Sequence, residues 1–191
     1  MKKYSKLADA FTPLAKGMNS EYANQNGYDC IQVHGGSGFM LEYACQRIYR
    51  DARITSIYEG TTQLQTVAAI RYVTNGFYSS VIEDYAQMPV AAELEGIKSR
   101  VAAMAEKFNA SVAKVKEAEN QELHDLCARH LYEMAADVIM CHLLMQNASK
   151  APEIFMHSLE VYANHAEAEV AKHATLVERM TVEQLDNYRQ A

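Results

Sequence analysis

Hydrophobic residues recur every three or four positions throughout the second half of the chain. Three such runs follow one another: Leu94, Ile97, Val101, Met104, Phe108, Val112 and Val115; then Leu123, Cys127, Leu131, Met134, Val138, Cys141 and Met145; then Phe155, Leu159, Tyr162, Ala166, Val170, Ala174 and Val177. This spacing is typical of amphipathic helices. Breaks near Glu119-Asn120 and between Asn147 and Pro152 separate the runs. Because long helices with short connections pack antiparallel, residues 90–191 are predicted to form a bundle of about three long helices.

The first half has a less regular pattern, and its elements are predicted mainly from their ends. Thr12-Pro13 is typical of a helix start, an N-cap followed by proline. That helix is expected to end at Gly35-Gly36-Ser37-Gly38, with Gly27 as a weak point within it. Further helices are expected from about Glu42 to Arg53, and from Gly60 to Asn75-Gly76. We interpret residues 1–77 as one domain, 78–89 as a linker and 90–191 as a helical bundle.

Composition agrees with an all-α fold and excludes several classes of function. The chain has 49% hydrophobic residues and only 8 Gly and 3 Pro, too few turn residues for a β-sandwich. The net charge is −6, and the sequence has no stripe of basic residues. Both features argue against a nucleic-acid partner or a polybasic membrane anchor. No apolar run approaches the roughly 18 residues of a membrane span, and no secretory signal is evident. A cytoplasmic, bacterial location is therefore expected.

The glycine cluster is one candidate for binding chemistry. Gln32, Val33, His34, Gly35 and Gly36 lie where one helix is predicted to end. Glycines there allow positive φ angles, and successive free N–H groups form a concave site for phosphate oxygens. Taken alone, these residues favour an ordinary helix C-cap.

Glu59 is the second candidate, because it stands between an aromatic residue and a glycine just before a predicted helix. A carboxylate there would cap the helix N-terminus. If Tyr58 and a ligand shielded it from water, it would instead serve as a general base. Spacing alone favours the helix cap.

Taken together, three motifs resemble the C-terminal signature of the acyl-CoA dehydrogenase family. They are Gln32-x-x-Gly35-Gly36-x-Gly38, Arg50-Asp51-Ala52-Arg53 and Tyr58-Glu59-Gly60-Thr61, in the family's order and spacing. The resemblance covers roughly residues 5–75. The acidic bundle that follows is similar in placement to the extra C-terminal helical domain of larger members.

The resemblance implies a reaction and a role for each matching residue. These flavoproteins oxidise an acyl-CoA thioester to the 2,3-enoyl-CoA, and Glu59 matches the base that removes the α-proton while the β-hydride passes to FAD. Tyr58 and Gly60 match positions along the substrate. Thr61, Thr62 and Gln63 match positions that contact FAD. A second set matches the turn that reaches the FAD of a neighbouring subunit: Gln32, Val33, His34, Gly35 and Gly36. Arg50 and Asp51 are expected to form a structural ion pair. Acyl-CoA and electron-transfer flavoprotein are the implied partners, and a homo-oligomer is expected.

The family's other domains, which hold most of the flavin and the CoA, find no counterpart in this sequence. We therefore expect a C-terminal fragment that alone neither binds FAD nor turns over substrate. The alternatives are a helical oligomerisation module that keeps the signature as a relic, and a homologue that binds another ligand without dehydrogenation.

No metal site is predicted. Cys30, Cys45, Cys127 and Cys141 are far apart without a Cys-x-x-Cys pair, so isolated reduced thiols are expected. His157, His165 and His173 recur every eight residues near Glu169, and Glu133 and Asp137 lie one turn apart. We interpret the histidines as part of a solvated helix face and the carboxylate pair as an ordinary feature of an acidic helix.

Overall fold

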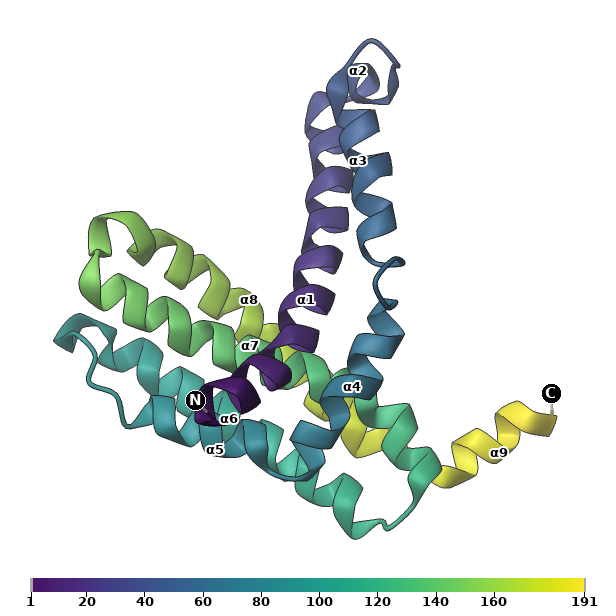
Figure 1. Cartoon of the computed structure of the whole chain (residues 1–191), viewed down its shortest axis with the longest axis vertical. Helices are drawn as coiled ribbons and strands as arrows, with labels where there is room; N and C mark the ends of the chain where they lie inside the picture. Colours follow the sequence, from purple (N-terminus) through teal and green to yellow (C-terminus); the bar gives the residue numbers. More distant parts are fainter. Residues whose placement is uncertain (1, 191) are drawn as a thin grey trace. The chain divides into compact units, whose positions relative to one another are not determined.

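The computed structural model describes residues 2–190, with side chains described for residues 4–184, 186 and 187. Over this range the chain is helical and contains no strand, which confirms the all-α prediction (Figure 1). The elements are α1 (Lys2–His34), α2 (Gly36–Phe39), α3 (Ala44–Thr55), α4 (Thr62–Thr74), α5 (Phe77–Ala86), the 3₁₀ turn η1 (Ala92–Leu94), α6 (Glu95–Glu117), α7 (Gln121–Lys150), α8 (Pro152–Arg179) and α9 (Val182–Gln190). They form two compact units, Met1–Ala69 and Ile70–Ala191, divided within α4.

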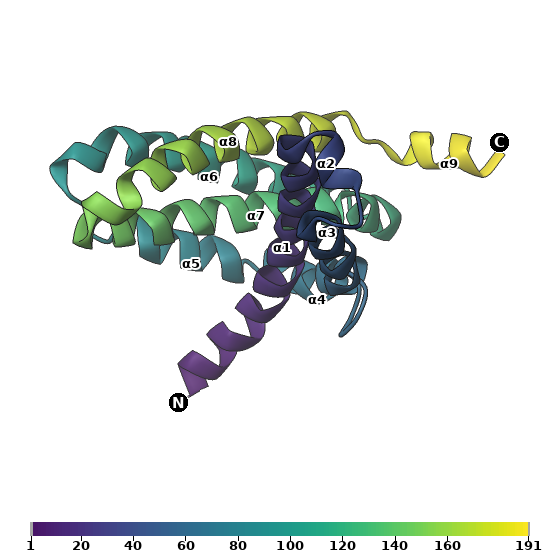
Figure 2. The same ribbon diagram turned by 90° about the horizontal axis from the view of Figure 1, so that it is seen from above.

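The second unit contains the predicted bundle of long helices. α6, α7 and α8 run alongside one another, as both views show (Figures 1 and 2). The predicted stripes supply its core: Val101, Phe108, Leu131, Val138 and Leu159 are completely buried. Asn120 begins α7 by accepting a hydrogen bond from the Leu123 amide at 3.0 Å, which satisfies one of the free N–H groups of the first turn. The predicted breaks therefore separate the helices where expected.

The segment expected to be a linker, residues 78–89, is largely helical. α5 covers most of it and packs against α7. Tyr78, Val81 and Ile82 of α5 are buried, and burial raises the pKa of the Tyr78 hydroxyl. These side chains follow helical spacing, so their burial against the bundle stabilises a helix in place of an extended connection.

In the first unit, α1 and α3 pack side by side and α2 forms the turn between them (Figure 1). The predicted helix start at Thr12-Pro13 is wrong, because α1 continues through Pro13. The Thr12 hydroxyl donates to the carbonyl of Ala8 at 2.7 Å, inside the helix. Pro13 removes one backbone hydrogen bond and crowds the preceding turn, and α1 changes direction along its length (Figure 2). Burial of Pro13 and Leu14 offsets part of that cost.

Two glycines of this unit mark close packing. A Cβ at Gly27 would lie 3.0 Å from the Cα of Tyr49, where α1 and α3 approach. Gly27, expected to be a weak point in the helix, is thus a packing position. A Cβ at Gly38 would lie 2.5 Å from the carbonyl oxygen of Ile31, a backbone atom that has little freedom to move.

Gly38→Ala is expected to lower the free energy of unfolding by about 1–3 kcal/mol, because the added methyl group forces the α2 turn away from α1. Gly36→Ala is the matched control, since a Cβ there meets nothing within 4 Å. Urea unfolding monitored by circular dichroism measures both variants. Equal stability of the two would contradict the close packing of the α2 turn on α1.

Candidate functional site

The turn between α3 and α4 carries the candidate base. Glu59 and Gly60 have φ angles of 54° and 92°, so two consecutive residues adopt the left-handed region. Such a conformation is uncommon for a non-glycine residue and is often associated with functional sites. Backbone hydrogen bonds hold the turn at both ends: Tyr58 N donates to the Ile54 carbonyl at 3.0 Å, and Thr62 N donates to the Ser56 carbonyl at 3.2 Å. The unusual position of Glu59 is therefore built into the fold.

The helix-capping interpretation of Glu59 is wrong. α4 begins at Thr62, and the side chain of the preceding residue, Thr61, accepts a hydrogen bond from the Leu64 amide at 3.3 Å. This is the bond that an N-cap makes. Glu59 lies too far upstream to take that place, so its carboxylate is free for another role.

A shallow cavity of about 250 Å³ lies between this turn and α1. Its lining consists of Lys16, Asn19, Ser20, Ala23, Thr55, Tyr58 and Glu59. Lys16 Nζ donates to the carbonyl of Gly60 at 2.5 Å and lies 5.9 Å from the centre of the Tyr58 ring. The Glu59 side chain is exposed and accepts no hydrogen bond from the described residues. The arrangement places an accessible proton acceptor at the edge of a partly formed pocket.

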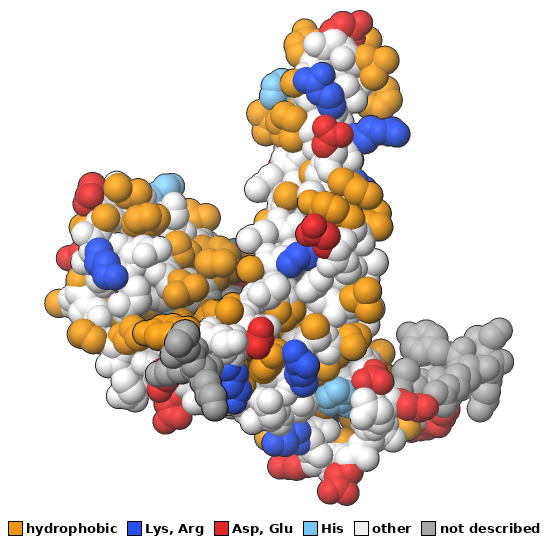
Figure 3. Space-filling view, viewed as in Figure 1, with side chains coloured by type: hydrophobic (Ala, Val, Ile, Leu, Met, Phe, Trp, Pro, Cys, Tyr) orange, Lys and Arg blue, Asp and Glu red, His pale blue; other side chains and the backbone are white. Residues whose placement is uncertain are grey.

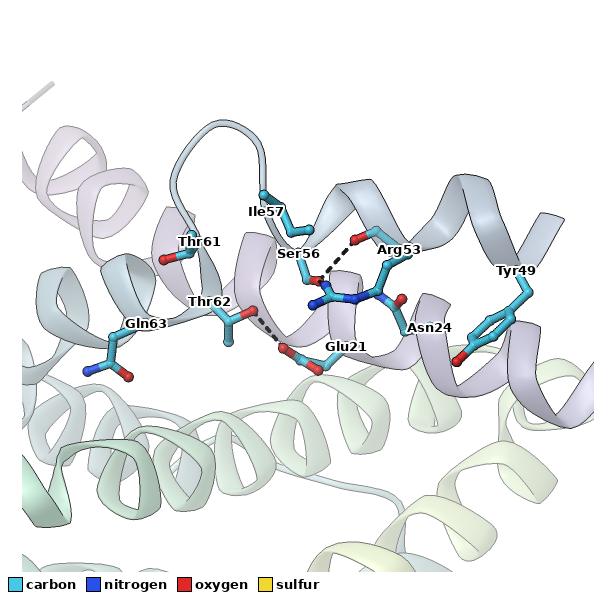
Figure 4. A pocket seen from close by; sticks show the side chains of 9 residues that line it. All are labelled: Glu21, Asn24, Tyr49, Arg53, Ser56, Ile57, Thr61, Thr62 and Gln63. Atoms are coloured by element: carbon cyan, nitrogen blue, oxygen red, sulfur yellow. Dashed lines mark hydrogen bonds between the residues drawn. The ribbon is translucent and has the colours of Figure 1, made fainter. Parts of the chain in front are cut away.

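A second cavity, of about 400 Å³, lies on the other side of the turn and has a polar wall (Figure 4). It is lined by Glu21, Asn24, Tyr49, Arg53, Ser56, Ile57, Thr61, Thr62 and Gln63. Thr62 Oγ1 donates to Glu21 Oε1 at 2.6 Å, and Arg53 donates to the hydroxyl of Ser56. Three of the predicted FAD contacts, Thr61, Thr62 and Gln63, therefore line one pocket.

Asn24 presents an unsatisfied acceptor in this cavity wall. Its Nδ2 donates to the carbonyls of Ser20 and Ala52, at 2.7 and 3.2 Å. Its Oδ1 is buried without a hydrogen-bond partner. A buried polar atom without a partner costs stability.

The predicted contacts of the glycine turn lie elsewhere. Gln32 is eleven residues beyond Glu21 on α1, about 16 Å along the axis. Gly35 has a φ of 59°, and its N–H donates to the Gln32 carbonyl at 3.1 Å. The helix-end interpretation thus holds for Gly35, because its N–H already donates within the chain and is not free to bind a phosphate oxygen. Exposed hydrophobic side chains surround this turn at the top of Figure 3: Val33, Phe39, Met40, Leu41 and Tyr43.

The expected ion pair between Arg50 and Asp51 is wrong. Both side chains are exposed, and no contact within 4.0 Å joins their charged groups in the described part of the chain. The neighbouring Arg53 has the structural role instead, through Ser56 and the second cavity.

In the second unit, a largely buried cluster joins α7 and α8. The solvated-face interpretation is therefore wrong for His173, whereas His157 and His165 are exposed as expected. His173 is only 4% exposed. Its Nε2 lies 2.8 Å from Glu133 Oε2, and its Nδ1 lies 2.8 Å from Nδ1 of His130. Burial lowers the pKa of His130, with the nearby His173 contributing. Burial alone would raise the pKa of Glu133, but hydrogen bonds and charge from His173 and Arg129 lower it overall.

Asp137, one turn beyond Glu133, is also buried and is 2% exposed. Tyr162 donates its hydroxyl hydrogen to Asp137 Oδ1 at 2.8 Å. Burial raises the pKa of Asp137 to about 6, although the Tyr162 hydrogen bond opposes the shift. Sequence reasoning missed this cluster, because its partners lie on two helices and more than 20 residues apart.

None of the helices in the described part of the chain is long and apolar enough to cross a membrane.

Comparison with known proteins assigns both units to one family. Residues 2–73 match the family described as "Acyl-CoA dehydrogenase, C-terminal domain", and residues 74–185 match "Acyl-CoA dehydrogenase C terminal". The chain is 40% identical over 70 residues to the mitochondrial long-chain specific acyl-CoA dehydrogenase of Sus scrofa, covering 37% of this chain and 16% of that protein. It is 38% identical over 63 residues to an acyl-CoA dehydrogenase of Bacillus subtilis, covering 33% and 17%. The matches thus span about one sixth of these relatives.

Solved structures agree with this assignment. An acyl-CoA dehydrogenase family protein from Porphyromonas gingivalis superposes with a TM-score of 0.56 at 38% identity, covering 60% of this chain and 98% of that one. Caenorhabditis elegans ACDH-11, in complex with C11-CoA, superposes with a TM-score of 0.68 over 89% of this chain and 29% of its own; at 22% identity this likeness shows the fold alone. Both units, and with them nearly the whole chain, are therefore accounted for: the chain belongs to the acyl-CoA dehydrogenase family and carries its C-terminal helical region.

Proposed function

We propose that this chain is the base-bearing part of an FAD-dependent acyl-CoA dehydrogenase, in which Glu59 removes the α-proton of an acyl-CoA thioester. The observation that carries the proposal is the place of Glu59. It stands in a turn with positive φ, beside a cavity, without a hydrogen-bond partner among the described residues. The motif Tyr58-Glu59-Gly60-Thr61 and the adjoining cavity distinguish Glu59 from other exposed glutamates of the chain, such as Glu42.

The chain's own residues would act by holding and shielding the reacting carbon. The Glu59 carboxylate takes the proton as the α-carbon–hydrogen bond breaks, which requires an approach to hydrogen-bond distance. Tyr58 and Gly60 flank it, and a side chain at Gly60 would obstruct the thioester. Lys16 fixes the Gly60 carbonyl and thereby the turn. Closure of the cavity by substrate and by further protein would exclude water from the carboxylate.

FAD, when bound, accepts the hydride from the β-carbon. The polar wall of the second cavity fits one edge of such a cofactor, because hydroxyl and amide side chains of Thr61, Thr62 and Gln63 line it. We propose that Thr61, Thr62 and Gln63 contact the FAD that serves Glu59. Gln32, Val33, His34, Gly35 and Gly36, on a separate exposed turn, would contact the FAD of a neighbouring subunit.

The remaining roles follow from the family. We propose acyl-CoA as substrate and electron-transfer flavoprotein as electron acceptor. We also propose residues 1–77 as the catalytic part and residues 90–191 as a self-association bundle. The apolar side chains around the α2 turn support an assembled state, because exposed patches of this kind mark contact surfaces.

A chimera tests this function. Residues 2–73 would replace the matching segment of the Bacillus subtilis acyl-CoA dehydrogenase, which is 38% identical over 63 residues. The chimera is expected to bind FAD and to reduce it when acyl-CoA is added, measured as loss of flavin absorbance. The isolated chain serves as the control and is expected to form no stable yellow complex with FAD and to turn nothing over. A flavin-loaded chimera without turnover would overturn the proposal and favour an oligomerisation module or another ligand.

A further inference from the structure

Two cysteines and a histidine from different helices meet near the end of α1. Cys30 and His34 are one turn apart on α1, and Cys45 is the second residue of α3. A sulfur or ring-nitrogen atom from each lies within 4.8 Å of the other two. Cys30 Sγ lies 3.9 Å from His34 Nδ1. Three side chains that commonly ligate metals therefore converge on one point, although Cys45 is remote from the others in sequence.

The packing of the α2 turn fixes this convergence. Gly38 sits so close to α1 that a Cβ there would lie 3.0 Å from the Cβ of His34. The carbonyl of Gly38 in turn accepts a hydrogen bond from Cys45 Sγ at 3.4 Å. Cys45 is 4% exposed, whereas Cys30 is half-buried and His34 is exposed. The cluster is thus held on its inner side and open to solvent on its outer side, which gives an ion a path of entry.

The donor set suits zinc. Two thiolates and an imidazole are ligands that Zn²⁺ prefers, with Zn–S of about 2.3 Å and Zn–N of about 2.0–2.1 Å. In a tetrahedral site such bonds separate the ligand atoms by about 3.4–3.8 Å. Side-chain movements on the order of 1 Å would bring the three donors to that spacing. His34 Nδ1, the nitrogen that faces Cys30 Sγ, donates to the Cys30 carbonyl at 2.8 Å. Metal binding through Nδ1 would replace this hydrogen bond by a bond to the ion.

The other two cysteines offer no comparable site. Cys127 and Cys141 are fully buried in the second unit. Burial raises the pKa of the Cys127 thiol, and it raises the pKa of Cys141 to about 12. Metal ligands must be thiolates, so these two residues serve as internal controls.

We propose that Cys30, His34 and Cys45 bind one Zn²⁺ ion, with the fourth coordination position open to water. Three protein ligands and an open position are compatible with tetrahedral zinc. Binding would lock the α2 turn between α1 and α3. The proposal needs neither flavin nor acyl-CoA, so it stands or fails separately from the dehydrogenase function.

The test uses the full chain, freed of metal by a chelator and kept reduced by a phosphine that does not bind zinc. Co²⁺ is the probe, because tetrahedral cobalt–thiolate sites absorb through sulfur-to-metal charge transfer. One equivalent of Co²⁺ is expected to produce this absorption, and one equivalent of Zn²⁺ is expected to abolish it. Absence of the charge-transfer band at saturating Co²⁺ would overturn the proposal, as would loss of both thiols to a disulfide under these reducing conditions.

Variants assign the ligands. Cys30→Ser is expected to diminish the charge-transfer absorption, and His34→Ala, at an exposed position, is expected to lower zinc affinity at least about tenfold. His157→Ala removes an exposed histidine of α8, and Cys127→Ala removes a thiol of the bundle; both are expected to leave binding unchanged. Affinity is measured by competition with a chromophoric chelator, and helicity by circular dichroism. Unchanged binding in Cys30→Ser, or loss of binding in His157→Ala, would contradict the assignment.

Discussion

Replacing Glu59 by glutamine in the flavin-loaded chimera is expected to lower turnover of acyl-CoA by about 10²–10⁴-fold, the usual contribution of a positioned general base. Glutamine keeps the size and polarity of the side chain but cannot accept the proton. The turn should remain intact, because the hydrogen bonds that hold it use backbone atoms of Tyr58, Thr62 and Gly60 and not the Glu59 carboxylate. Rapid mixing with acyl-CoA, followed by flavin absorbance, measures the effect.

Glu42→Gln is the matched control for this variant. Glu42 is an exposed glutamate in the connection between α2 and α3, so its replacement removes the same charge away from the cavity. It is expected to leave turnover near the level of the unmodified chimera. Turnover retained in Glu59→Gln would assign the base to another group and would favour the interpretation of the signature as a structural relic.

Replacing Asp137 by asparagine is expected to change how stability depends on pH. Burial raises the pKa of Asp137 from 3.8 to about 6 in the folded chain. The folded state therefore binds a proton more readily than the unfolded state. The stability that this proton provides is fully present below pH 3.8 and is lost as the pH rises toward 6. At 1.36 kcal/mol for each pKa unit, the loss is about 3 kcal/mol.

Asparagine does not titrate, so the variant should gain stability relative to the unmodified chain as the pH rises from 4 to 7. Taking the difference between the two proteins cancels titrating groups that do not interact with Asp137, such as His142, whose pKa burial lowers to about 4. His165, His173 and Glu133 interact with Asp137 and contribute to the difference. Urea unfolding at a series of pH values measures this difference. Glu160→Gln, at an exposed position of α8, controls for removal of one negative charge. If the difference in free energy of unfolding between the two proteins stayed constant from pH 4 to pH 7, the raised pKa of a buried Asp137 would be contradicted.

The bundle could be predicted because the hydrophobic spacing that indicates each helix lies within that helix's own sequence. Steps of three and four residues place Val101, Phe108 and Leu131 on the inner face of their helices, and all three are completely buried. Helix ends at His34 and Thr74 were predicted from glycines that follow them. The start at Thr12-Pro13 was wrong, because a local capping signal does not reveal that residues before it continue the same helix.

The contacts that sequence reasoning missed all join distant segments. His130 and His173 meet across α7 and α8, and Cys30 meets Cys45 across the α2 turn. Neither pair has a short spacing that would signal it. The same limit explains Gly27, whose role depends on Tyr49 of a neighbouring helix. The position of Glu59 before a helix start also suited a helix cap. Its candidate role as a base could therefore be recognised only from the motif that its neighbours form.

Exchange of the substrate's α-hydrogen with solvent tests the role of Glu59 most directly, because this exchange reports removal of the α-proton and does not require hydride transfer. The flavin-loaded chimera would be incubated with acyl-CoA in D₂O, and deuterium at the α-carbon would be measured by mass spectrometry. We predict that the chimera with Glu59 incorporates deuterium and that Glu59→Gln does not, although both bind FAD. Equal incorporation by the two proteins would contradict the assignment of Glu59 as the base.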